Sequence, residues 1–229
     1  MNIEIVSATP NPLEVIYKSC RTCYSAVGPI RLKEKSIDEM ISLIDGTIKS
    51  GHHSVLEHVS MTFAIEGVSR ALTHQLVRHR LASFSQQSQR YVNYCKGKET
   101  TDVDFIVPKT IKKNTEALNE YQLLIEEIKR AYKKLIDIGI PAEDARYILP
   151  NATETKLIMT MNFRELFTVS SIRLCFRAQW EIVELFGKIK KEVFKIDEYL
   201  ASKLQPKCQN LGYCNEDKSC GKYTFGSKG

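Results

Sequence analysis

The chain has 229 residues, of which 43% are hydrophobic and 26% are charged, and its formal net charge is +6. This composition is ordinary for a globular protein, and no apolar run approaches the roughly 20 residues of a membrane span, so we expect no membrane partner. Residues 1–6 include neither a basic n-region nor an apolar h-region, which predicts a cytoplasmic protein without a secretory signal.

The first half of the chain alternates between strand and helix patterns. Apolar residues at every second position predict strands, and apolar residues three and four apart predict amphipathic helices. Ser36 is a suitable N-cap for a helix that Gly51 is expected to end, and Gly67 is expected to break a strand. The expected elements are strands over 2–6 and 59–65, helices over 12–24, 36–50 and 69–79, and an extended segment over 86–94.

The second half of the chain is mostly helical in pattern until its last residues. The expected elements are strands over 103–107 and 156–161, and helices over 114–137, 141–147, 163–176 and 178–202. Beyond Leu204 the sequence turns to Lys, Gly, Asn and Cys, and we expect it to pack loosely. We therefore predict an α+β fold with a single domain over 1–205, whose helices pack around a small, mostly antiparallel sheet, and a cysteine-containing tail over 206–229.

The run over residues 78–90 is the most informative stretch because it is basic, contains several hydroxyl groups and has no acidic residue. Successive helical residues point about 100° apart, so Arg78, His79 and Arg80 cannot all face one ligand from the middle of a straight helix. Either the helix ends there, or these residues serve different ligands, or different subunits share them.

The second part of this run suits an anion if it is extended, because residues two apart then share a face. Gln86, Ser88 and Arg90 could converge on one phosphate through amide, hydroxyl and guanidinium groups. Two alternatives stay open at this point. The run could be a solvated basic helix end, or a nucleic-acid-binding strip, although Phe84 and Tyr91 are its only nearby aromatic residues.

The cysteines raise a third functional hypothesis, that of a zinc protein. The chain has seven, and an odd number favours reduced thiols. Cys20 and Cys23 form a CxxC pair, and Cys208, Cys214 and Cys220 follow at equal intervals near the end of the chain. This pair and two tail cysteines could supply the four ligands that zinc prefers, but their spacing does not require it. We favour unligated thiols and predict no metal.

Four segments of the chain, taken in order, carry a family pattern. They are 51–58 (Gly-His-His-Ser-Val-Leu-Glu-His), the basic run 78–90, 145–150 (Ala-Arg-Tyr-Ile-Leu-Pro), and 162–181, which includes Asn162-x-Arg164 and Arg173-x-Cys175-x-Arg177. Together these segments resemble the flavin-dependent thymidylate synthases. The resemblance extends in order from residue 1 to about residue 205.

The resemblance implies a reductive methylation of dUMP to dTMP. In this family methylenetetrahydrofolate supplies the carbon, and NADPH supplies the hydride through FAD. The family is homotetrameric and several subunits contribute to each active site, which would remove the geometric difficulty of the basic run. The implied partners are therefore these small molecules and other copies of the chain, and no nucleic acid.

The resemblance also implies roles for individual residues. Arg173 matches the arginine that promotes ionisation of the uracil N3–H, and Ser54 is expected to reach the flavin of a neighbouring subunit. The expected flavin contacts are Ser54, Arg78, His79, Arg80, Gln86, Asn162, Arg164 and Thr168. The expected dUMP contacts are Gln75, Arg78, Gln86, Gln87, Ser88, Gln89, Arg90, Arg146 and Arg173.

The chain departs from the family pattern at two of these positions. Some members have Asn-Glu where this chain has Ser85-Gln86, so position 86 cannot supply a carboxylate here. Thr168 stands where an amide or imidazole is often found. Cys175 lies among apolar residues and is expected in the core. For His52, His53 and His58 we prefer structural or flavin-proximal roles over metal binding.

Overall fold

The computed structural model describes residues 1–33, 35–95 and 100–222. These residues divide into two compact units, and each unit is assembled from separated segments. The first unit contains residues 1–2, 65–78 and 85–158. The second contains residues 3–64, 79–84 and the described part of 159–229. Residues 223–229 of the expected tail lie outside the described residues.

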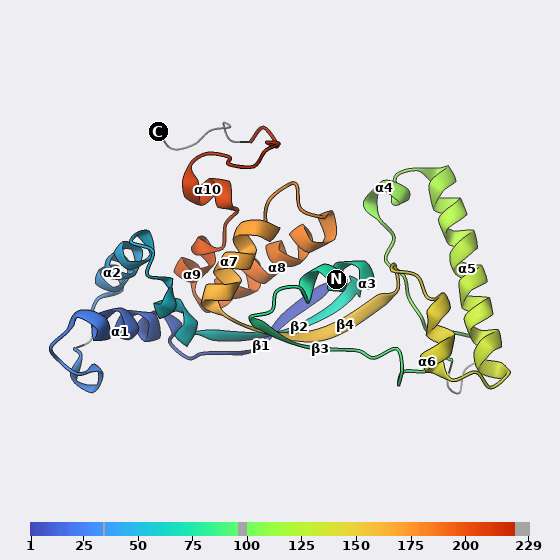
Figure 1. Cartoon of the computed structure of the whole chain (residues 1–229), viewed down its shortest axis with the longest axis horizontal. Helices are drawn as coiled ribbons and strands as arrows, with labels where there is room; N and C mark the ends of the chain where they lie inside the picture. The colour runs from blue at the N-terminus through green and yellow to red at the C-terminus, as the bar shows by residue number, and fades with distance from the viewer. Residues whose placement is uncertain (34, 96–99, 223–229) are drawn as a thin grey trace. The chain divides into compact units, whose positions relative to one another are not determined.

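Four antiparallel strands form one sheet in the order β1-β2-β4-β3 (Figure 1). Their bounds are β1 Asn2–Ala8, β2 Ser60–Ser69, β3 Ala82–Gln86 and β4 Glu154–Asn162. Every second residue of β4 is buried, from Thr155 to Met161, which is the pattern of a strand with one face against the core. The predicted mixture of helices with a small, mostly antiparallel sheet is confirmed.

Three predictions about strands and extended segments were wrong. Gly67 does not break β2, because it adopts a φ of 69° inside the strand, and an added Cβ there would lie 2.7 Å from the Met1 nitrogen. Residues 103–107 form no strand, because their only β-type pairing is an isolated bridge between Phe105 and Thr153. Of residues 86–94, only Gln86 belongs to a strand, and turns follow it.

The helices of the second unit are α1 Pro12–Tyr24, α2 Ile37–Lys49, α7 Phe163–Arg173, α8 Trp180–Ile196, α9 Glu198–Lys203 and α10 Lys207–Leu211, with short 3₁₀ turns η1 Pro29–Arg31 and η2 His53–His58. Ser36 caps the start of α2, as its sequence predicted, and forms a reciprocal capping box with Glu39. The predicted helix over 178–202 is interrupted at Asp197, whose extended backbone and side-chain oxygen begin α9.

The helices of the first unit are α3 Arg70–Leu76, α4 Lys109–Lys112, α5 Thr115–Asp137 and α6 Ala142–Ala145, with the turn η3 Arg146–Ile148. Tyr132 of α5 is fully buried and packs with Cys95 and Ala145 in a small apolar core. Helix α3 begins at its Ser69 cap and ends at Leu76, earlier than the predicted residue 79. Arg78, His79 and Arg80 therefore lie beyond the helix, which is the first of the alternatives that helix geometry left open. Within the described parts of the chain, no helix is long and apolar enough to cross a membrane.

Candidate active site

The last residue of α7 and the turn before β3 meet through one hydrogen bond. The Nε atom of Arg173 donates to Nε2 of His79 at 2.9 Å. Burial, and then the charge of Arg173, lower the pKa of His79. The imidazole is therefore neutral at pH 7, and because its Nε2 accepts, its proton is assigned to Nδ1. Burial also lowers the pKa of Arg173, but a guanidinium stays charged at neutral pH. The pair therefore consists of the charged guanidinium of Arg173 held in place by the neutral imidazole of His79.

The first turns of α7 carry a second polar group, which faces η2. Arg164 forms an ion pair with Glu57, and both side chains are close to half exposed. The side-chain oxygen of Asn162 accepts from the backbone N–H of Glu165 at 2.8 Å and caps the helix. Thr168 donates its hydroxyl to the Arg164 carbonyl at 3.0 Å, so this hydroxyl is engaged within its own helix.

An arginine-rich group in the first unit is organised around Glu143 of α6. The Nε atom of Arg90 donates to a carboxylate oxygen of Glu143 at 2.8 Å, and the Nε atom of Arg146 donates to the Glu143 carbonyl at 2.9 Å. Ser88 accepts from the backbone N–H of Arg90 at 3.2 Å. Burial, and in smaller part the charge of Arg146, lower the pKa of Arg70. One carboxylate among three guanidinium groups leaves a positive site suited to an anion.

Gln86 has its amide nitrogen turned toward two buried threonines. This nitrogen donates to the hydroxyl of Thr73 at 3.0 Å and to that of Thr155 at 3.3 Å. Both threonines are almost fully buried. The contact links β3 to α3 and β4, so Gln86 supports the fold of the first unit. The neighbouring Gln87 pairs its backbone N–H with the Lys156 carbonyl at 2.9 Å.

The two sets of residues expected from the sequence fall largely into different units. The expected flavin contacts in the second unit are Ser54, His79, Arg80, Asn162, Arg164 and Thr168. The expected dUMP contacts in the first unit are Gln75, Arg78, Gln86, Gln87, Ser88, Gln89, Arg90 and Arg146. Arg78 and Gln86, which were expected at the flavin as well, lie in the first unit, whereas Arg173 is the one expected dUMP contact in the second.

Two charged residues of these groups were not singled out from the sequence. Glu57 stands in the segment 51–58, so the family pattern itself could have identified it. Glu143 precedes Arg146 by three residues, a spacing that brings helical neighbours together. Its contact with Arg90 joins distant parts of the chain and has no local signal in the sequence.

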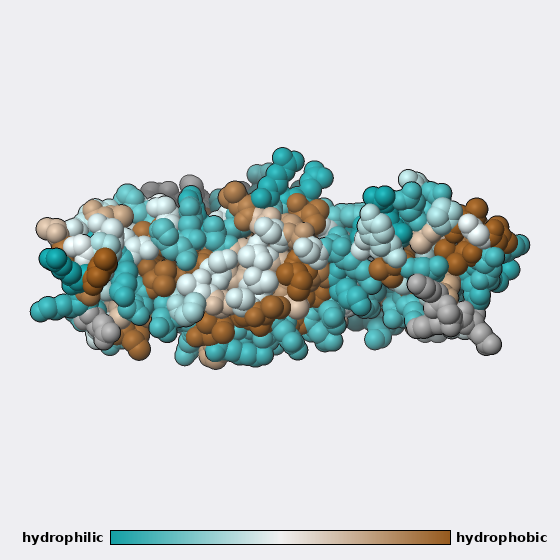
Figure 2. Space-filling view, turned by 90° about the horizontal axis from the view of Figure 1, so that it is seen from below, coloured by the Kyte–Doolittle hydropathy of each residue, from teal (hydrophilic) through white to brown (hydrophobic). Residues whose placement is uncertain are grey.

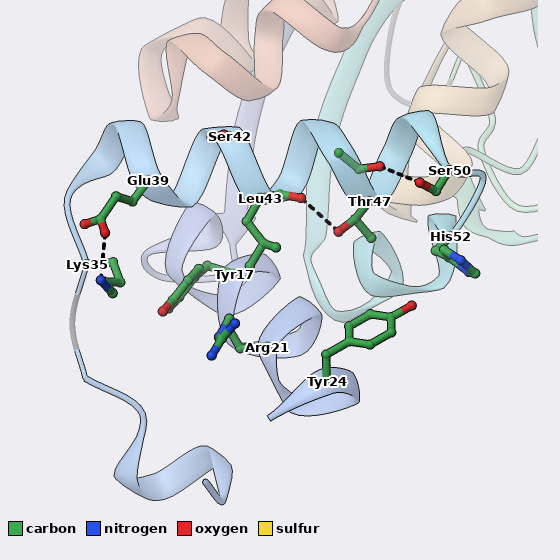
Figure 3. Close-up of a pocket in the computed structure, with 11 residues that line it drawn as sticks. Tyr17, Arg21, Tyr24, Lys35, Glu39, Ser42, Leu43, Thr47, Ser50 and His52 are labelled. Carbon is green, nitrogen blue, oxygen red and sulfur yellow. Dashed lines mark hydrogen bonds and ion pairs between the residues drawn. The ribbon is translucent and has the colours of Figure 1, made fainter. Parts of the chain in front are cut away.

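A pocket of about 810 Å³ lies between α1 and α2 in the second unit (Figure 3). Tyr17, Arg21 and Tyr24 line it from one face of α1, and Figure 3 shows them opposite the residues of α2. Lys35, which is paired with Glu39 at 2.7 Å, also lines it. Tyrosine rings and cations together suit a ligand that is both aromatic and anionic.

The pocket also reaches the segment 51–58 through His52. The next residue, His53, is held in place by its Nε2, which lies 3.1 Å from the Ile48 carbonyl, and by an edge contact with Phe167. This part of the segment is therefore fixed between α2 and α7.

Comparison with known proteins gives one consistent result. The family model described as thymidylate synthase complementing protein matches residues 4–197. A flavin-dependent thymidylate synthase of Geobacter sulfurreducens is 42% identical, over 97% of this chain and 94% of that protein. Its counterpart in Pyrococcus furiosus is 41% identical, over 94% of this chain and 90% of that protein.

Among solved structures, the chain shares its fold with the UMP/dUMP methylase PolB of Streptomyces cacaoi, whose structure contains 5-bromo-dUMP. The TM-score is 0.76, and the match covers 88% of this chain and 93% of that one. The two sequences are 23% identical.

Proposed function

This chain belongs to the flavin-dependent thymidylate synthases, and from that premise we propose how its residues divide the work of converting dUMP to dTMP. The reaction is a reductive methylation. The cofactor is FAD, the carbon donor is methylenetetrahydrofolate, and NADPH is the source of the hydride. The observation that carries the proposal is the bond between Arg173 and His79.

The polar groups of the second unit fit a flavin with a diphosphate. Exposed guanidinium groups at Arg80 and Arg164 suit phosphate oxygens, and the amide of Asn162 and the hydroxyl of Ser54 suit polar ring atoms. When bound, FAD supplies the electrons that reduce the transferred carbon. The residues that we propose to hold it are Ser54, Arg78, His79, Arg80, Gln86, Asn162, Arg164 and Thr168.

Arg173 acts on the uracil ring in this proposal. Loss of the N3 proton leaves negative charge on the pyrimidine, and a guanidinium stabilises that charge without itself titrating. His79 is a positioning residue for Arg173, because its neutral nitrogen accepts from Nε and leaves the terminal amino groups pointing elsewhere.

The arginine group of the first unit is our proposed site for the dUMP phosphate. Arg90 and Arg146 both contact Glu143, so a phosphate would replace the carboxylate of that residue as the partner of Arg90. Ser88 can add a hydroxyl donor. The further dUMP contacts that we propose are Gln75, Arg78, Gln86, Gln87, Gln89 and Arg173.

We place the folate co-substrate in the pocket between α1 and α2. Folate combines aromatic rings with a carboxylate-bearing glutamate, and the pocket offers Tyr17 and Tyr24 together with Arg21 and Lys35. It belongs to the same unit as most of the proposed flavin contacts.

We also propose a cytoplasmic homotetramer whose active sites are shared between subunits. Large apolar side chains are exposed on the single chain, among them Leu81, Tyr91 and Phe176 at 74%, 81% and 63%. Figure 2 shows apolar side chains in several separate areas on one face of the molecule. Contacts with other copies would cover such surfaces. Residues 1–205 would form the enzyme domain, with 206–229 as a tail.

The absorbance spectrum of the purified protein tests this proposal. We expect flavin bands that NADPH bleaches faster when dUMP is present. A colourless protein that takes up no added FAD would contradict it. Steeply salt-dependent binding to DNA or RNA would instead support the nucleic-acid hypothesis, whereas lack of binding at low salt would remove it.

A further inference from the structure

Four cysteine side chains line a single cavity of about 320 Å³ in the second unit. Cys175 follows α7, and Cys208 belongs to α10. Cys214 and Cys220 come from the chain after α10, which is followed by its cap residue Gly212 with a φ of 80°. Three of these cysteines are the equally spaced series noticed in the sequence. The fourth, Cys175, was expected in the core and instead faces the same space.

The end of the described chain is held against the segment that carries Cys175. Arg177 donates through Nη1 to the Lys218 carbonyl at 2.7 Å. The ammonium group of Lys222 lies 4.6 Å from the centre of the Phe176 ring. Cys214 is only 6% exposed. Residues 215–222 are all exposed, as expected for a loosely packed tail, but these contacts hold them beside Phe176 and Arg177.

The wall of the cavity is predominantly cationic. Arg173, Arg177 and Lys207 line it, against one carboxylate from Glu216. Cysteine binds metals as the thiolate, and the surrounding cations would offset the negative charge of four thiolate ligands.

We propose that Cys175, Cys208, Cys214 and Cys220 ligate an iron–sulfur cluster. Four cysteine thiolates are the usual ligand set of such clusters. A single zinc ion would bring four sulfurs to about 2.3 Å from one point, whereas a cluster fills a space between its ligands. The four cysteines line one cavity of about 320 Å³. Within the described residues, no three Cys, His, Asp or Glu side chains converge closely enough to hold one ion.

The cluster has a structural role in this proposal. It joins the tail to the chain immediately after Arg173, which lines the same cavity. It does not use the Cys20 and Cys23 pair of α1, neither of which borders the cavity. Cys20 is buried, and burial raises the pKa of its thiol. The zinc hypothesis had assigned that pair to a shared site with the tail.

Metal analysis of the full chain tests the proposal. The protein would be produced with ample iron, purified without oxygen, and assayed for iron, acid-labile sulfide and zinc. We expect iron and sulfide in equal amounts, at about two to four of each per chain. Reduction with dithionite should give an electron paramagnetic resonance signal distinct from that of a flavin radical. Absence of iron and sulfide, or about one zinc per chain in their place, would overturn the proposal.

Two exposed cysteines offer a matched pair of variants. Cys220 borders the cavity and Cys23 does not, and both are exposed in the structure. We expect Cys23→Ser to keep its iron and sulfide and Cys220→Ser to lose most of both. Cys208→Ser should lose them entirely. FAD content and the thermal midpoint report whether each variant has folded. Equal iron in Cys220→Ser and Cys23→Ser, with both folded, would contradict the assignment.

Discussion

Arg173 and His79 are joined by a hydrogen bond of 2.9 Å in which the guanidinium donates and the imidazole accepts. They are 94 residues apart in sequence. Because His79 takes the Nε–H, the orientation of the guanidinium plane is set before a substrate arrives. Such preorganised donors are more effective than flexible ones at stabilising charge that develops during a reaction.

Replacement of Arg173 by alanine should remove the group that stabilises the uracil anion. We expect dTMP formation to fall by about a thousandfold or more, while FAD remains bound. Chromatography of the products and the flavin absorbance measure the two effects. Arg130→Ala, on the exposed surface of α5, is the control and should leave both unchanged. Full activity in the Arg173 variant would refute this role.

The acid limb of the activity profile should depend on His79. Its pKa is below the ordinary value of 6.5, so the imidazole is neutral above that pH and becomes charged only as the pH falls through its lowered pKa. Protonation removes the acceptor of Arg173 and places two cations together, so both activity and this contribution to stability decrease on the acid side. Above pH 6.5, the activity and this contribution to stability are both fully present.

Glutamine at position 79 keeps an acceptor but does not titrate. We therefore expect His79→Gln to be slower than the unchanged protein at neutral pH, but to lack the acid limb in its profile of kcat against pH. A limb of the same shape and midpoint in the variant would show that another group is responsible.

The sequence identified the groups of this site but not their contacts. The family segments located Arg173, Arg164 and the basic run, and helical periodicity located α1, α2 and α5 within a residue or so of their observed ends. Periodicity could not locate the end of α3 at Leu76, because its apolar pattern continues into Val77. Nor could it place Cys175 beside the tail, since that contact depends on how distant segments fold back on each other.

Glu143 should compete with the phosphate of dUMP for Arg90. Its carboxylate and the guanidinium are about half exposed, and such pairs contribute up to about 1 kcal/mol. Glu143→Gln weakens this competitor, so we expect the KM for dUMP to fall by about two- to fivefold with little change in kcat. Steady-state kinetics with dUMP varied would measure it. Glu116→Gln, at the start of α5, serves as the charge-matched control. A raised KM in the Glu143 variant would mean that this carboxylate assists binding.

Gln86 should contribute to stability in addition to its proposed ligand contacts. Gln86→Ala leaves the hydroxyls of Thr73 and Thr155 without this partner, and we expect the free energy of unfolding to fall by about 1–2 kcal/mol. Urea denaturation measures it, with Gln87→Ala as the neighbouring comparison. Unchanged stability in Gln86→Ala would contradict this structural role.

Arg21 provides the test of the folate pocket. It lies on the same face of α1 as Tyr17 and Tyr24 and lines the pocket that Figure 3 shows. Loss of one charge-assisted contact to a folate carboxylate costs about 1.5 kcal/mol or more, so Arg21→Ala should raise the KM for methylenetetrahydrofolate by about tenfold. The KM for dUMP should not change, because Arg21 is not among the proposed dUMP contacts.

The control for this variant is Arg31→Ala. Arg31 is exposed at the end of η1, close in sequence to Arg21, and does not line the pocket. The Arg31→Ala variant loses the same charge from a nearby part of the chain. A general electrostatic effect on anionic substrates would therefore change the KM values of both variants alike. A rise in the folate KM confined to Arg21→Ala supports the pocket. Equal rises in both variants, or a rise in the KM for dUMP in place of that for folate, would place the co-substrate elsewhere.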